Sequence, residues 1–150
     1  MGSVVANLRE AFTGELAPPP MSLRAANAID SGEGLCTFEP LADSPTPAYF
    51  EQHFWGIPHL DPVSWRYYLP RLLEYGLESL QAPGPNAVDF ALASLRPPDT
   101  IPPRFGSLTP AQEAAIVAAL EEFAFNSESP WQEPAMIALE EYWAPGAVYR

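Results

Sequence analysis

Apolar residues recur at helical spacing along most of the chain. Between Pro62 and Leu80 they fall at intervals of three and four residues and form one stripe, while polar residues gather on the opposite side. The same spacing recurs near the N-terminus, before residue 125 and towards the C-terminal end. Alternation typical of strands is confined to a few residues, of which Gly34 to Phe38 is the best candidate. The pattern therefore predicts an all-α protein.

Prolines mark the expected starts of several helices. A proline at the first helical position loses no useful N–H, and its φ is already set for the helix. Four prolines directly follow a good N-cap residue, in Thr46-Pro47, Asp61-Pro62, Thr109-Pro110 and Ser129-Pro130. Gln112 and Gln132 stand three residues after the last two caps, where each glutamine can complete a capping box.

Spacing and caps together place the expected elements. A short helix is predicted from Ser22 to Ile29, and longer helices are predicted at roughly 3–12, 47–55, 62–81, 87–95, 110–124 and 130–143. Two segments rich in Gly, Pro and Ser are expected to be loops, at 31–46 and 96–107. With 150 residues, 47% of them hydrophobic, the chain suffices for one core. We expect a single helical domain over residues 1–150, with five to seven helices and Pro/Gly-rich loops.

The charge excludes one class of function and suggests another. The formal net charge is −12, and the seven basic side chains are all arginines. Nucleic-acid binding through phosphates needs a basic face, so we do not expect it. Residues 107–150 carry seven acids against one arginine. Such an excess keeps a protein in solution, and it also suits a basic protein partner.

Cysteine usage and hydropathy bear on the compartment. Cys36 is the only cysteine, so neither an intrachain disulfide nor a cysteine-based zinc site can form. No apolar run approaches the ~18 residues that a membrane span requires, and the N-terminal residues lack the pattern of a signal peptide. We expect a soluble, cytoplasmic protein that does not bind membranes.

Few residues suggest catalysis. His53, His59 and Asp61 are a candidate metal group, but their spacing matches no known metal motif and Asp61 is already explained as an N-cap. Cys36 lies in a Gly-rich loop without a base near it in sequence. The chain contains no G-x-S-x-G, H-E-x-x-H, P-loop or dinucleotide-binding glycine pattern. We therefore expect no enzyme, no cofactor and no metal.

One aromatic residue stands outside the apolar stripe of the 62–81 helix. Tyr67 shares the polar face with Arg71, Glu74 and Glu78, and an exposed Tyr beside an Arg is typical of a binding hot spot. The alternative is a tyrosine lying flat over a neighbouring loop. The two glutamates are interpreted as a solvated face and not as paired catalytic carboxylates. Pro70, inside the helix, is expected to bend it and to lie towards solvent.

Two stretches carry a family resemblance. SWRYYLPRLL at residues 64–73 joins aromatic residues to Tyr-Leu-Pro, and SLTPAQEAAI at residues 107–116 contains L-T-x-x-Q. Together they resemble the landmarks of DUF6714, a family of small bacterial proteins of unknown function, over about residues 49–125. The resemblance brings no catalytic residues. It implies a small acidic protein similar in kind to the immunity proteins that bind a toxin and block its active site.

The first hypothesis is an immunity-type binding protein that neutralises a cognate bacterial toxin by occluding its active-site cleft. Toxins that act on nucleic acids or phosphorylated cofactors need basic clefts, which an acidic, aromatic-containing surface complements. The candidate partner-binding residues are Tyr67, Arg71, Glu74, Glu78, Glu121, Glu122, Glu140 and Glu141. The alternative is a non-enzymatic helical scaffold, adaptor or oligomeric assembly protein. A third hypothesis, an enzyme, would use His53 or His59 with a carboxylate.

Overall fold

Every regular element is a helix in the residues that the computed structural model describes, which are 2–34, 36–81 and 83–150. The α-helices are α1 (Gly2–Ala11), α2 (Leu23–Asp30), α3 (Pro47–His53), α4 (Pro62–Leu77), α5 (Asn86–Ala93), α6 (Pro110–Phe125) and α7 (Gln132–Ala138). Shorter turns are η1 (Thr13–Glu15), η2 (Phe54–His59), η3 (Phe105–Ser107) and the π-helical η4 (Leu139–Trp143). The all-α prediction is confirmed. The strand candidate at 34–38 includes Leu35, which lies outside the described residues, and the residues beside it form no strand.

Three of the predicted proline starts have the expected caps. The side chains of Thr46, Asp61 and Thr109 each accept a hydrogen bond from a backbone N–H in the first turn that follows. At Thr109 the capping box is complete, because the Gln112 side-chain oxygen also accepts from the Thr109 N–H at 3.0 Å. These three helices begin where the sequence predicts because the cap and the proline act within a few residues of each other.

The predicted capping box at Ser129 is wrong. The Ser129 hydroxyl accepts from the Trp131 N–H at 3.1 Å, which closes a tight turn, and α7 begins only at Gln132. The Gln132 amide reaches back to the Asn126 carbonyl at 2.9 Å instead of to the cap. The helix predicted at 130–143 is therefore shorter at its start, and its last turn is the π-helical η4.

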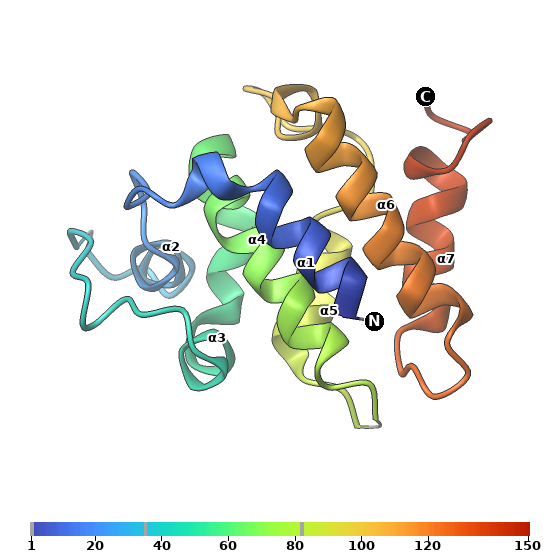
Figure 1. Ribbon diagram of the computed structural model, residues 1–150. Helices are drawn as coiled ribbons and strands as arrows, with labels where there is room; N and C mark the ends of the chain where they lie inside the picture. The colour runs from blue at the N-terminus through green and yellow to red at the C-terminus, as the bar shows by residue number, and fades with distance from the viewer. Residues whose placement is uncertain (1, 35, 82) are drawn as a thin grey trace.

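Helix α4 packs against α1, α5 and α6. Figure 1 shows α1 crossing in front of α4, with α6 and then α7 beyond it, while α2, α3 and the 31–46 loop lie at the other side of the molecule. The buried side chains of these helices form one apolar cluster, in which the largest include Trp65, Tyr68, Phe50, Phe123 and Trp131. Among the described residues, no helix is long and apolar enough to cross a membrane.

Helix α2 and η2 pack backbone against backbone. Gly56 of η2 is buried, and a β-carbon built on it would lie 2.5 Å from the Asn27 nitrogen and 2.7 Å from the Leu23 carbonyl oxygen. Real β-carbons do not approach other atoms so closely. Ala26 of α2 is fully buried. A glycine against an alanine-lined helix therefore sets the separation of these two elements.

Candidate functional site

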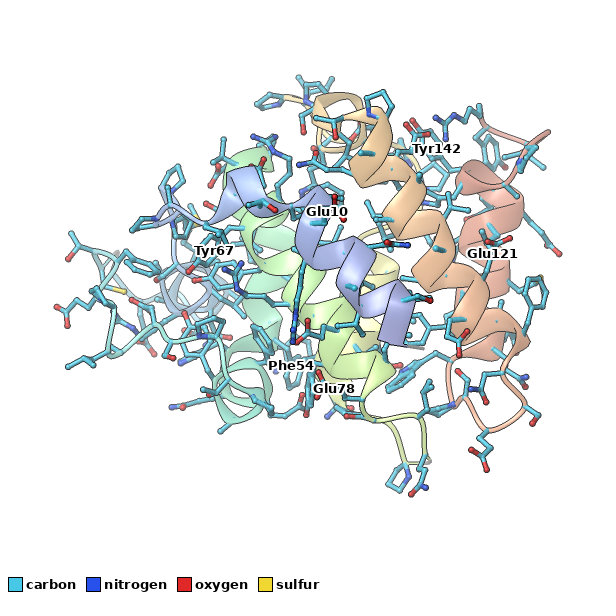
Figure 2. All side chains as sticks on the ribbon, in the orientation of Figure 1. Glu10, Phe54, Tyr67, Glu78, Glu121 and Tyr142 are labelled. Carbon is cyan, nitrogen blue, oxygen red and sulfur yellow. The ribbon has the colours of Figure 1, made fainter. Side chains whose placement is uncertain are left out.

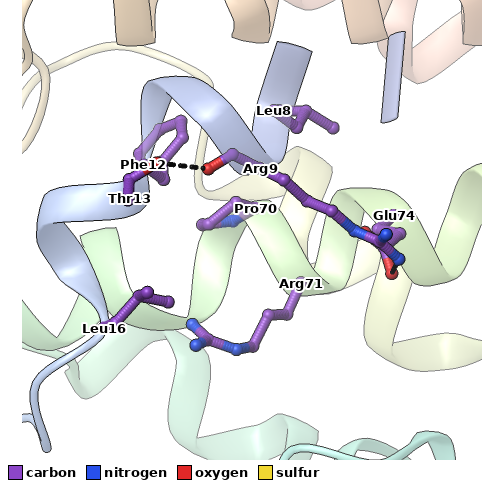
Figure 3. Close-up of a pocket in the computed structure, with 8 residues that line it drawn as sticks. All are labelled: Leu8, Arg9, Phe12, Thr13, Leu16, Pro70, Arg71 and Glu74. Carbon is purple, nitrogen blue, oxygen red and sulfur yellow. Dashed lines mark hydrogen bonds and ion pairs between the residues drawn. The ribbon is translucent and has the colours of Figure 1, made fainter. Parts of the chain in front are cut away.

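The face of α4 that the sequence predicts to be polar is covered in the folded protein. Tyr67 is only 8% exposed, and Phe38 of the 31–46 loop packs edge-on against its ring with 6.3 Å between centroids. Pro70 is also buried, and it lies beneath α1 in Figure 3. The predictions of an exposed Tyr67 and a solvent-facing Pro70 are wrong. The alternative for Tyr67 is closer, since this side chain packs against a neighbouring loop, although the contact with Phe38 is edge-on. A helical wheel describes one helix, and here a loop and a second helix pack onto its polar side.

Arg71 lies over the Tyr67 ring. Its guanidinium carbon is 4.2 Å from the ring centroid, and Nη1 donates to the Tyr67 carbonyl. The stacked geometry fixes the plane of the guanidinium, which has five N–H donors in total. Figure 3 shows the group pointing towards Leu16 and away from Glu74. The predicted pair of Tyr67 and Arg71 therefore exists, with Tyr67 buried and Arg71 half-buried above its ring.

Glu74 ties α4 to α1. Both of its carboxylate oxygens accept from Arg9, at 2.7 and 2.9 Å, and these hydrogen bonds hold the pKa of Glu74 below its ordinary value. A second ion pair joins α4 to the segment after α1, where Arg66 of α4 donates to Glu15 of η1 at 3.0 Å. The N-terminal segment is thus fastened to α4 at two points. Glu78, one turn beyond Glu74, is exposed.

A pocket lies on α1 and α4 beside the Arg9–Glu74 tie (Figure 3). Its volume is about 430 Å³. Apolar side chains of both helices and of the segment after α1 make most of its wall, and polar groups stand at its edge. The lining residues are Leu8, Arg9, Phe12, Thr13, Leu16, Pro70, Arg71 and Glu74. The structure therefore brings Arg71 and Glu74 together at one cavity, as the sequence predicted for the same face, but Tyr67 does not line it.

The predicted C-terminal acids lie elsewhere. Glu121 and Glu140 are exposed, and Glu122 is half-buried. Glu141 forms two hydrogen bonds with Arg96, at 2.7 and 2.8 Å, which lower the pKa of its carboxyl. Figure 2 shows Glu121 at the α6–α7 side of the molecule and Glu78 at the far end of α4. The eight predicted residues therefore do not form one continuous site.

Almost all of the arginines make ion pairs or hydrogen bonds within the protein. Ion pairs with carboxylates engage Arg9, Arg24, Arg66, Arg96 and Arg150. Arg104 is buried and donates to three backbone carbonyls near the end of η2, those of Ile57, Pro58 and Leu60. Within the described residues, Arg71 is the arginine that is neither buried nor paired with a carboxylate.

A buried polar cluster that no sequence pattern predicts holds the 31–46 loop in place. Asp43 is fully buried and accepts from Nε and Nη2 of Arg24, each at 3.0 Å, from the Glu39 N–H at 2.8 Å and from the Tyr49 hydroxyl at 2.8 Å. Burial by itself would raise the pKa of Asp43, but the hydrogen bonds from Arg24, Glu39 and Tyr49 outweigh it, and the pKa lies below its ordinary value.

Two phenols complete this cluster at the start of α2. The Tyr49 hydroxyl accepts from the Arg24 N–H at 3.0 Å, and the Tyr68 hydroxyl accepts from the Leu23 N–H at 3.1 Å. These N–H groups belong to the first turn of α2 and have no partner within the helix. Burial raises the pKa of both phenols, so they stay neutral. The cluster joins α2, α3 and α4 and leaves Asp43 no oxygen for a ligand.

The two histidines and the cysteine each contact a different partner. His53 is buried beside the Tyr49 ring, and this burial lowers its pKa. His59 instead pairs with Asp30 at 3.0 Å, while Asp61 caps α4 as predicted. The described residues contain no group of three His, Cys, Asp or Glu side chains that could hold a metal ion. The Cys36 thiol accepts from Arg24 at 3.2 Å.

Comparison with known proteins identifies a family for the whole chain. No curated protein and no solved structure matches it. One family model does match, over residues 1–147, which is wider than the 49–125 of the sequence resemblance and includes the 31–46 loop and both α6 and α7. The protein therefore belongs to DUF6714, a family of unknown function.

Proposed function

We propose that this protein is a non-catalytic binding protein that presents the acidic surface of α6 and α7 to a basic protein partner. The observation that supports it is the engagement of the arginines in internal contacts, which leaves the net charge of −12 on carboxylates at the surface. Several of these carboxylates belong to the α6–α7 segment, where neither an ion pair nor a side-chain hydrogen bond neutralises Glu121, Glu133 or Glu140 among the described residues. Such a surface speeds encounter with a partner of opposite charge.

The partner class we propose is a bacterial toxin with a basic active-site cleft, so the protein would act as an immunity protein. A cleft that binds nucleic acid or phosphorylated cofactors needs positive charge, and a rigid acidic helix pair can enter and occlude it. The carboxylates of α6 and α7 would then supply the specificity for this partner. Phe125, the last residue of α6 and 65% exposed, would supply an apolar anchor at one end of this surface.

Neutralising two acids of this surface is expected to slow binding. We expect Glu121→Gln with Glu140→Gln to lower the association rate with the cognate toxin about tenfold, because charges at an interface act mainly on encounter. The binding partner would be a toxin encoded beside this protein, and surface plasmon resonance would give both rate constants. Co-expression should protect cells from that toxin, and the double variant should protect them less.

The matched control is Glu33→Gln with Glu39→Gln, which removes the same charge from exposed residues of the 31–46 loop. This loop lies at the opposite side of the molecule from α6 and α7 (Figure 1). This control should bind at the wild-type rate. If both double variants bind equally fast, the α6–α7 surface is not the interface. If no neighbouring toxin forms a complex and none is blocked, the immunity proposal is rejected.

A second candidate, an oligomeric assembly protein, is favoured by one observation. Trp55 is 54% exposed, and its ring packs against Phe54 and Phe90, with centroids 5.2 and 5.0 Å apart. Exposed tryptophan in an aromatic cluster is typical of interface hot spots. Under this proposal, light scattering after size-exclusion chromatography would show a defined oligomer that Trp55→Ser converts to monomer. A wild-type monomer at high concentration would reject this candidate.

A further inference from the structure

We propose that the pocket on α1 and α4 binds a small amphipathic carboxylate, with its apolar part inside the pocket and its carboxylate on the Arg71 guanidinium. This site lies apart from the acidic surface of α6 and α7, so the inference does not depend on the proposed partner.

The walls of the pocket are apolar and already formed. Leu8 of α1 and Phe12, directly after α1, close it on one side, and Pro70 of α4 closes it on the other. Leu16 lines the pocket as well, although 61% of this leucine is exposed. An apolar ligand would cover the exposed part of Leu16 and remove it from water, which favours binding.

Two ion pairs fix the elements that carry these walls. The Arg9–Glu74 tie joins α1 to α4, and the Glu15–Arg66 tie joins η1 to the same helix. A ligand would therefore enter a cavity whose walls are held by other contacts, which reduces the cost of ordering them on binding. The volume of about 430 Å³ lies in the range of small-molecule sites. It suits a carboxylate with a chain of about ten carbons.

Arg71 gives the pocket its charge preference. Its contact with the Tyr67 carbonyl uses one donor, and the other N–H groups make no hydrogen bond within the described residues. The ring of Tyr67 holds the guanidinium in place at 4.2 Å. A carboxylate at this position would gain charge-assisted hydrogen bonds, and the planar fork of an arginine can take both of its oxygens.

Glu74, the acidic residue of the pocket, does not reverse the preference for an anionic ligand. Glu74 already accepts two hydrogen bonds from Arg9, one on each oxygen, so its negative charge is balanced within the protein. An amine ligand would have to compete with this ion pair, whereas a carboxylate ligand meets Arg71 without displacing a protein side chain. The pocket therefore favours an anion over a cation of the same length.

The experiment compares three ligands of equal chain length by isothermal titration calorimetry. We expect wild-type protein to bind decanoate about tenfold more tightly than decanol or decylamine, because only decanoate gains the charge-assisted hydrogen bonds. Arg71→Gln should remove this preference and bind all three with similar affinity. Leu16→Ser should weaken decanoate and decanol alike, since it removes only apolar contact.

Arg96→Gln is the matched control, because it removes an arginine that contacts no pocket residue and pairs with Glu141. It should leave the preference for decanoate unchanged. Circular dichroism would verify that each variant is folded, and amide NMR shifts on adding decanoate should centre on Thr13, Leu16 and Arg71. The proposal is overturned if wild-type protein does not bind decanoate or binds the three ligands equally. It is also overturned if folded Arg71→Gln keeps the preference.

Discussion

Replacing Gly56 with alanine is expected to destabilise the protein by about 3 kcal/mol, at the upper end of the cost of overpacking. The new methyl group would lie 2.5 Å from the Asn27 nitrogen and 2.7 Å from the Leu23 carbonyl oxygen. Both atoms are backbone of α2, so no side chain can turn away to make room. The helix and η2 would have to separate, and urea unfolding followed by circular dichroism would measure the loss.

Gly14→Ala is the matched control for this substitution. A β-carbon at Gly14 meets nothing within 4 Å, and its φ lies outside the range that disfavours L residues. We expect its free energy of unfolding to equal or slightly exceed that of the wild type, since alanine restricts the unfolded chain. Similar stability of the Gly56 and Gly14 variants would show that α2 and η2 are not in close backbone contact.

Replacing Asp43 with asparagine is expected to cost about 3 kcal/mol at pH 7, the lower end of the range for breaking a buried ion pair. The exchange preserves the size of the side chain but removes its charge, and the amide NH₂ would face the donors of Arg24 or Glu39. Partial exposure of Arg24, whose side chain is 29% exposed, lets water replace some of the lost contacts. Urea unfolding again measures the difference.

The effect of Asp43→Asn should depend on pH in one direction. Since the folded-state pKa of Asp43 lies below its ordinary value, the carboxylate stabilises the fold above the unfolded pKa of about 3.9. This contribution disappears as the pH falls through the folded pKa. The difference between wild type and variant should therefore be greatest near neutrality and shrink below about pH 4. Glu39→Gln, in the same loop but exposed, should change stability little at any pH.

The sequence predicted those features of the fold that depend on neighbours along the chain. The caps at Thr46, Asp61 and Thr109 and the helices after them are confirmed, because cap, proline and first turn interact locally. The helix predicted at 62–81 ends at Leu77, where the N–H groups of Glu78 and Ser79 turn back to carbonyls of the last turn. Ser129 was predicted wrongly because the same residue type can cap a helix or close a turn.

The site was less predictable because it depends on contacts between distant segments. The wheel of α4 could not show that Phe38 covers Tyr67 or that α1 covers Pro70. Asp43 had no signal in the sequence, since an aspartate beside Ser and Pro is usual in an exposed loop. The grouping of Arg71 with Glu74 was predictable, as both lie on one side of the same helix at close spacing.

Ionic strength acts on this molecule in opposite directions at two places. The Arg9–Glu74 tie is an exposed ion pair, with Arg9 70% exposed, so dissolved ions weaken it. The excess carboxylates repel one another, and the same ions relieve that repulsion. Added salt should thus stabilise the body of the protein while it loosens α1. The contact between α1 and α4 then loses its ion pair under conditions in which the repulsion among the surface carboxylates is smallest.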